Sequence, residues 1–130
     1  MSDTLRVIQP DGARPPAGHY SHGIVHNGLL FGAGQLPIDP ATGRRLTGEP
    51  MDVQARQALA NLDAVLRAGG SRRDLVLKTT VFVRDIELWD AVNAVYAEFF
   101  GAHRPSRSIV PTGPLHFGLL VEIEAVAALA

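Results

Sequence analysis

The stretch that decides the fold is DVQARQALANLDAVLRAGGSRRDLVLKTTVFV, residues 52–83. From Asp52 to Ala68, apolar residues recur every three or four positions, which predicts a helix with one apolar face. We expect Asp52 to cap the start of this helix and Gly69-Gly70 to end it in the left-handed conformation. Leu75 to Val83 is rich in β-branched residues and predicts a strand. A helix followed so closely by a strand indicates a domain in which helices pack on a sheet.

Upstream of this stretch the sequence predicts a β-hairpin. Two runs with apolar residues, Ser21 to His26 and Leu29 to Leu36, are joined by Asn27-Gly28. Asn-Gly favours the positive φ angles of a type I′ turn, whose twist matches that of the two strands. The first 19 residues are rich in Pro and Gly and indicate an irregular arm, with a short strand around Leu5–Ile8.

Downstream, the pattern predicts a second helix over Glu87 to Phe100, ended by Gly101, and two further strands, Ser108 to Pro111 and Leu119 to Ala127. The resulting order is β-β-α-β-α-β-β. We therefore expect a single α+β domain over residues 1–130, with one mixed sheet and both helices on one face of it. No other part of the sequence is left to cover the second face, so we expect a homo-oligomer.

Composition excludes several classes of function. The 130 residues carry a formal net charge of -1, with 46% hydrophobic and 19% charged residues, and show no basic stripe of the kind that binds nucleic acid. No apolar run approaches the roughly 18 residues that span a bilayer. The absence of cysteine excludes disulfides, thiolate metal sites and a cysteine nucleophile, and it fits a cytoplasmic location. The five histidines do not form a zinc set with an acidic residue, so we expect no metal.

Candidate site residues lie near the ends of the predicted strands. Arg107 could hold a carboxylate through two parallel hydrogen bonds, although a surface or interface arginine is the commoner role. Glu122 and Glu124 share one side of an otherwise apolar strand, and a solvated face is the preferred interpretation for Glu124. Gly34 belongs to Gly32-Ala33-Gly34-Gln35, where glycines allow either close approach of a ligand to the backbone or a bulge. Tyr20 could present its hydroxyl to a site.

Taken together, several segments resemble the RidA (YjgF) family, in order and over nearly the whole chain from about Ala17 to Ala127. They are Ala17-Gly18-His19-Tyr20, Gly32 to Gly43, Gln54 to Leu62, Lys78 to Val83, Val92 to Phe100, Pro105-Ser106-Arg107-Ser108 and Val121 to Ala125.

The resemblance implies a chorismate-mutase-like α+β fold and a homotrimer whose sheets form a central barrel, with three clefts between subunits. It also implies a hydrolase of the 2-iminobutanoate/2-iminopropanoate deaminase type. Such a protein converts reactive enamines and imines, such as 2-aminoacrylate, to 2-oxo acids and ammonia, and uses no metal or organic cofactor. The implied partner is a small imine that bears a carboxylate, and neither nucleic acid nor a membrane is expected.

The same resemblance assigns roles to individual residues. Arg107 would bind the substrate carboxylate, and Glu122 would be the acid/base group that activates water. Gly34 would offer its backbone N–H to the carboxylate. Tyr20 and Asn93 would shape the cleft from the neighbouring subunit. From the sequence alone, a structural hydrogen bond from the second helix to a loop is the leading interpretation of Asn93.

Two positions depart from the family pattern. Ala33 stands where a serine is usual, and Ile109 stands where a cysteine is usual and should share a strand face with Arg107. Both are expected to line the substrate site and to make it more apolar. Three functions therefore remain in view: an imine deaminase, a non-catalytic binder of small carboxylates and, least favoured by composition, an endoribonuclease. The Pro111–Phe117 loop has no functional interpretation at this level.

Overall fold

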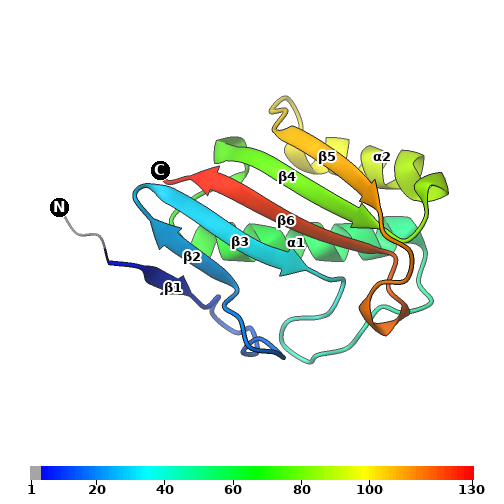
Figure 1. Cartoon of the computed structure of the whole chain (residues 1–130), viewed down its shortest axis with the longest axis horizontal. Coiled ribbons are helices and arrows are strands. Elements are labelled where there is room, and N and C mark those ends of the chain that lie inside the picture. Colours follow the sequence, from blue (N-terminus) through cyan, green and yellow to red (C-terminus); the bar gives the residue numbers. More distant parts are fainter. Residues whose placement is uncertain (1–3) are drawn as a thin grey trace.

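The computed structural model describes residues 4–130 as a six-stranded sheet in the order β1-β2-β3-β6-β4-β5, with two helices (Figure 1). The strands are β1 (Arg6–Ile8), β2 (Gly23–His26), β3 (Leu29–Gln35), β4 (Val76–Val83), β5 (Ser106–Pro111) and β6 (Val121–Ala128), and the helices are α1 (Met51–Ala68) and α2 (Trp89–Phe100). The expected α+β fold with one mixed sheet is confirmed, because β4 and β5 pair in parallel and the other pairs are antiparallel.

The β2–β3 hairpin turns as its sequence predicts. Asn27 has φ 51° and Gly28 has φ 77°, the pair of positive angles that defines a type I′ turn. Strand β3 then pairs with β6, the last strand of the chain, and β6 lies between β3 and β4. The C-terminal strand is therefore central to the sheet, and β5 is an edge strand.

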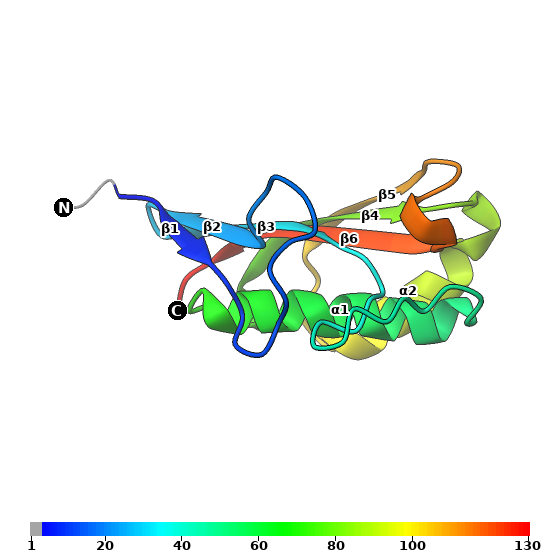
Figure 2. The ribbon, with the colours of Figure 1, turned by 90° about the horizontal axis from the view of Figure 1, so that it is seen from below.

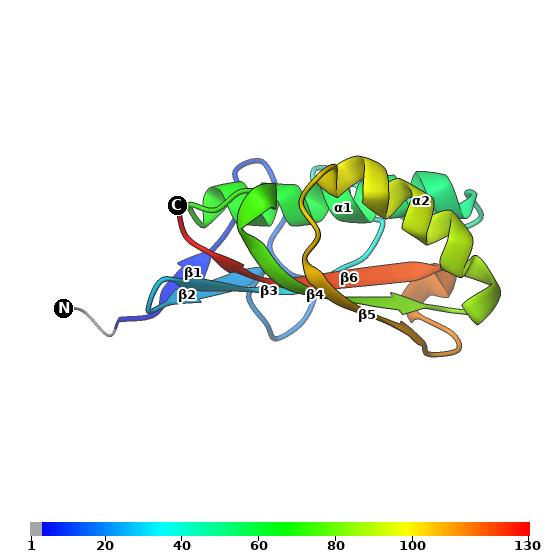
Figure 3. The same cartoon turned by 90° about the horizontal axis from the view of Figure 1, so that it is seen from above.

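Both helices cover the same face of the sheet, as Figures 2 and 3 show from opposite sides. The core lies between these two layers and is formed by the apolar faces of α1 and α2 and by alternate residues of the strands. In β6 the alternation is plain, since Val121, Ile123 and Ala125 are at most 4% exposed whereas Glu122 and Glu124 point the other way. On that opposite face Phe31 and Val110 keep 47% and 38% of their surface exposed, and nothing in residues 4–130 packs over it as a second layer.

Some local expectations need correction. Asp52 does not cap α1: Pro50 occupies the cap position without a side-chain hydrogen bond, and Asp52 lies in the first turn, where it pairs with Arg56 at 3.1 Å. Leu75 belongs to a single 3-10 turn that precedes β4, and Glu87 belongs to another that precedes α2. Strand β5 starts at Ser106, because it pairs with β4 from Lys78 onward, so Arg107 lies within a strand.

Candidate active site

Arg107 projects from β5 toward α2. Its Nη1 donates a hydrogen bond of 2.9 Å to Oδ1 of Asn93, and its guanidinium carbon lies 4.7 Å from the ring centre of Tyr96 and 5.4 Å from that of Trp89. No carboxylate of residues 4–130 forms an ion pair with it. Arg107 is therefore held by one neutral partner and two rings, and it keeps its charge and most of its N–H groups for an anion. It lines a cavity of about 510 Å³ that also contains His103 and Arg104.

The Tyr96 ring, which lies next to the Arg107 guanidinium, is held by a hydrogen bond to a core residue. The hydroxyls of Tyr96 and Thr79 lie 2.7 Å apart, and Thr79 is fully buried. Burial raises the pKa of the Tyr96 hydroxyl, while the Thr79 hydrogen bond and the charge of Arg107 lower it. Because the pKa stays above its ordinary value, Tyr96 is neutral at physiological pH and serves as a polar, hydrogen-bonded support for the guanidinium.

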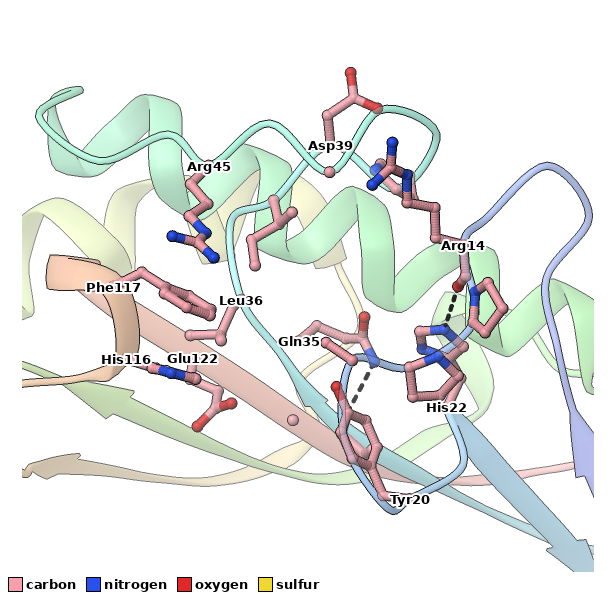
Figure 4. Close-up of a pocket in the computed structure, with 18 residues that line it drawn as sticks. Arg14, Tyr20, His22, Gln35, Leu36, Asp39, Arg45, His116, Phe117 and Glu122 are labelled. Atoms are coloured by element: carbon pink, nitrogen blue, oxygen red, sulfur yellow. Dashed lines mark hydrogen bonds between the residues drawn. The ribbon is translucent and has the colours of Figure 1, made fainter.

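Glu122 lies in a second cavity, of about 690 Å³, at the end of the sheet where β3 finishes and β6 begins (Figure 4). Tyr20, Ala33 and Gly34 line it as well. Apart from Gln35 of β3, the remaining lining comes from the loop before β2, the loop after β3 and the turn before β6. It includes Arg14, His22, Leu36, Asp39, Arg45, His116 and Phe117.

Gly34 leaves room for the Glu122 carboxylate. A Cβ atom at position 34 would lie 2.9 Å from Cδ and 2.9 Å from Oε2 of Glu122, closer than such atoms approach in proteins. The β3–β6 register also shifts between Gly32 and Gln35, which marks a bulge at this point. Gly34 thus leaves the space that the Glu122 carboxylate occupies, and no unusual backbone angle demands a glycine here.

The surroundings of Glu122 raise the pKa of its carboxyl group. Partial burial is the largest cause, and repulsion by Glu124 acts in the same direction, whereas His116 lowers the pKa. A carboxyl group with a raised pKa exchanges protons more readily near neutral pH than an ordinary glutamate does. The environment of Glu122 therefore suits an acid/base group.

Within one chain, Arg107 and Glu122 lie on opposite faces of the sheet. Glu122 pairs with Phe82 of β4, and Phe82 pairs in turn with Val110 of β5, so these three share the uncovered face. Arg107 pairs with the buried Thr79 and shares the helix-covered face. Because the sheet separates them, a small ligand cannot contact both side chains of the same chain.

Most of the expected site residues fall into two groups, one in each cavity. Tyr20, Ala33 and Gly34 accompany Glu122, and Asn93 accompanies Arg107. This arrangement differs from the expected one. Tyr20 and Asn93 were expected to come together from the neighbouring subunit, but within one chain they line different cavities. Ile109 shares the face of Arg107, as expected, but it packs against the core and lines neither of these cavities.

Sequence reasoning missed two groups of residues. Gln54 and Asn61 are buried in α1 and hold the loops that line the Glu122 cavity. Asn61 Nδ2 donates to the carbonyl oxygens of Leu36 and Ile38 at 3.0 and 2.8 Å. Gln54 Oε1 accepts from the N–H of Leu120 at 2.9 Å. A signal was available, because both are polar residues on the apolar face of the helix.

The second missed group is Arg45, His116 and Phe117, which line the Glu122 cavity. His116 and Phe117 belong to the Pro111–Phe117 loop, for which the sequence offered no functional interpretation.

In residues 4–130 no three histidine or acidic side chains come close enough to hold a metal ion. Among the described helices, none has the length and apolar character needed to cross a membrane.

Fold and site geometry together define a small α+β protein with two separate candidate half-sites, a basic one around Arg107 and one of mixed charge around Glu122. Comparison with known proteins gives the family. The family model described as endoribonuclease L-PSP matches residues 11–129. A RutC family protein of Synechocystis is 43% identical over 97% of this chain and 98% of its own length. A 2-iminobutanoate/2-iminopropanoate deaminase of Salmonella typhimurium is 37% identical over 94% and 96%.

A solved structure agrees with these relatives. The crystal structure of Escherichia coli TdcF with bound serine superposes with a TM-score of 0.88, at 32% identity, over 96% of this chain and 99% of that one. The chain belongs to the endoribonuclease L-PSP family, which is the RidA (YjgF) family that its sequence resembles.

Proposed function

We propose that this protein hydrolyses reactive 2-imino and 2-enamino acids of the 2-aminoacrylate type to 2-oxo acids and ammonia. The observation that carries the proposal is the pair of half-sites: an arginine without an acidic partner, and a half-buried carboxyl group with a raised pKa. Relatives named as 2-iminobutanoate/2-iminopropanoate deaminases support it. The formal net charge of -1 speaks against the ribonuclease activity in the family's name.

The proposed site forms between copies of the chain. Since the sheet separates Arg107 from Glu122, both reach one substrate only if the β5 edge of one copy meets the uncovered sheet face of another. Exposed Phe31 and Val110 give that face an apolar surface suited to such a contact. A homotrimer, as the resemblance implies, would hold three equivalent clefts.

The proposed chemistry needs little beyond positioning and one proton shuttle. Arg107 of one copy binds the substrate carboxylate and thereby places the imine carbon in the cavity of the next copy. Glu122 takes a proton from water as the water oxygen bonds to that carbon. The proton then passes to the imine nitrogen, which gives a carbinolamine. Glu122 next takes the hydroxyl proton and delivers it to the same nitrogen, so that the carbonyl forms, the carbon–nitrogen bond breaks, ammonia leaves and a 2-oxo acid remains.

Ala33 supports a second candidate function, the binding of small carboxylates without turnover. It lines the Glu122 cavity, and an alanine brings no hydroxyl to the water there. The other departure, Ile109, lines neither the Arg107 cavity nor the Glu122 cavity, because its side chain packs on the core.

A coupled assay distinguishes the two candidates. Imines are generated from several amino acids by an amino-acid oxidase, and the release of ammonia is followed with and without the protein. Arg107→Ala should lower the efficiency about 10- to 1000-fold, because charge-assisted hydrogen bonds are worth ~1.5–3 kcal/mol each. Arg84→Ala is the control, since Arg84 pairs with Asp85 away from both cavities.

An unchanged rate in the Arg107→Ala protein would contradict the deaminase proposal. Thermal stabilisation by 2-oxo acids, together with no acceleration for any imine, would instead support the binding function.

A further inference from the structure

A stack of three side chains forms one wall of the Glu122 cavity. The rings of His116 and Phe117 lie parallel, with 3.5 Å between their centres, and the Arg45 guanidinium carbon lies 3.5 Å from the centre of the Phe117 ring. Two groups so close to one ring must occupy its two faces. Figure 4 shows the three side chains following one another from the loop after β3 toward Glu122.

Backbone contacts hold this stack in place. Phe117 has φ 61°, in the left-handed region, which is uncommon for a bulky residue and persists only where surrounding contacts impose it. One such contact is the hydroxyl of Thr47, which donates to the Phe117 carbonyl oxygen at 2.8 Å. On the other side, Arg45 is joined to Ile38 by an antiparallel bridge. The loop after β3 and the turn before β6 are thus joined, and the Arg45 guanidinium packs against the Phe117 ring.

The charge of Arg45 is not neutralised within the described chain. No carboxylate of residues 4–130 lies within ion-pair distance of it, whereas the adjacent Arg44 lies 3.9 Å from Glu49. The other acidic residue near this end of the cavity, Asp39, accepts from the backbone N–H groups of Ala41 and Thr42. A guanidinium stacked face-on over a ring keeps its N–H groups in the plane, free to bind a carboxylate through two parallel bonds.

The cavity also has space beyond the needs of a small imine. Its volume of about 690 Å³ falls within the range that accommodates drug-sized ligands, ~300–1,000 Å³. A substrate such as 2-aminoacrylate, with its carboxylate held by Arg107 of a neighbouring copy, would leave the wall of Arg45 and Phe117 uncontacted. A longer side chain that ends in a negative charge would reach and satisfy it.

We infer that Arg45, held flat by Phe117, is a second carboxylate-binding arginine and gives the site a preference for dicarboxylic 2-imino and 2-oxo acids. The inference rests on the proposed function for the placement of the first carboxylate at Arg107. It assigns Arg45 to substrate selection and leaves the proton transfers to Glu122.

Binding of two 2-oxo acids of equal chain length tests this without relying on turnover. 2-Oxoglutarate and 2-oxopentanoate differ only in whether the far end is a carboxylate or a methyl group. By calorimetry, the protein in its native oligomeric state should bind 2-oxoglutarate about 10- to 100-fold more tightly, the range expected for a charge-assisted pair. Arg45→Gln should abolish the difference by weakening 2-oxoglutarate alone.

Two further variants sharpen the test. Arg44→Gln is the matched control, because Arg44 neighbours Arg45 in sequence but does not line the cavity, and this variant should keep the preference. Phe117→Leu keeps the charge of Arg45 but removes the ring on which it stacks, and it should reduce the preference. Both arginines are solvent-exposed, so unchanged melting temperatures should confirm that their variants fold.

The outcomes separate this inference from the proposed function. Equal affinity for the two ligands, binding of neither ligand, or a preference that survives Arg45→Gln would overturn the role of Arg45. Imine hydrolysis could be intact in each of these cases. Conversely, a preference that Arg45→Gln abolishes would support the role of Arg45 even if no imine is hydrolysed.

Discussion

Gly34 and Glu122 are so close that residue 34 cannot carry a side chain while the Glu122 carboxylate keeps its position. The nearest atoms to a Cβ at position 34 are Cδ and Oε2 of Glu122, both at 2.9 Å, and these belong to the far end of a flexible side chain. We therefore predict that Gly34→Ala folds but turns the Glu122 carboxylate aside. Imine hydrolysis should fall by about 10-fold or more, as for a misplaced acid/base group, with only a small change in melting temperature.

The Glu122→Ala background provides the control for this prediction. If the contact with the carboxylate is the cause, Gly34→Ala should change the melting temperature less in Glu122→Ala protein than in the parent. An equal loss of stability in both backgrounds would show that the alanine strains the β3 backbone instead.

The separation of Arg107 and Glu122 by the sheet predicts complementation between inactive variants. Arg107→Ala and Glu122→Ala proteins should each be weakly active as pure oligomers. When they are unfolded together and refolded as mixed oligomers, some clefts receive Arg107 from one copy and Glu122 from another, and activity should return in part. Mixing the two folded proteins without exchange of subunits is the control, and no gain after exchange would contradict a site shared between copies.

The charges around Glu122 predict opposite shifts in the pH dependence of activity. Glu124 raises the pKa of Glu122, so Glu124→Gln should lower it and move the acid limb of kcat/KM to lower pH. His116 lowers that pKa where its imidazole carries charge, so His116→Gln should move the limb to higher pH. A titration of the Glu122 carboxyl carbon by NMR measures the same shifts without an assay. Shifts of the same sign in both variants would contradict this account.

The buried pair of Thr79 and Tyr96 predicts a non-additive effect on stability. Tyr96→Phe leaves the Thr79 hydroxyl buried without its partner, and Thr79→Val does the same to the tyrosine, so each should cost about 1–3 kcal/mol of unfolding free energy. The double variant removes both polar groups and should cost less than the sum of the two. Chemical denaturation measures all three, and strict additivity would mean that the hydrogen bond contributes nothing.

Much of the local structure was predictable because it depends on neighbours in the sequence. The apolar periodicity of residues 52–68 identified α1, and Asn27-Gly28 identified the type I′ turn, since both signals act over a few residues. Predictions were weaker at element ends, where Pro50 rather than Asp52 occupies the cap position of α1. Such ends depend on how the adjoining loop packs, and Gln54 contributes to that packing through the loop at Glu49.

The sequence predicted which residues form the candidate site but not how they are placed relative to one another. The resemblance identified Arg107, Glu122 and Gly34, and strand alternation gave the relative orientation of residues within each strand. Whether two residues on different strands share a face depends on the register between those strands. Register arises from long-range pairing, here the insertion of β6 between β3 and β4, which no local pattern reveals.

The sequence by itself therefore determined the family, the helices, the hairpin and the identity of the principal polar residues. Only the tertiary structure decided that Arg107 and Glu122 lie on opposite faces and that Arg45 stacks on Phe117. The physical reason is that side-chain periodicity is a property of one element, whereas the meeting of distant segments is set by the packing of the whole sheet against its helices.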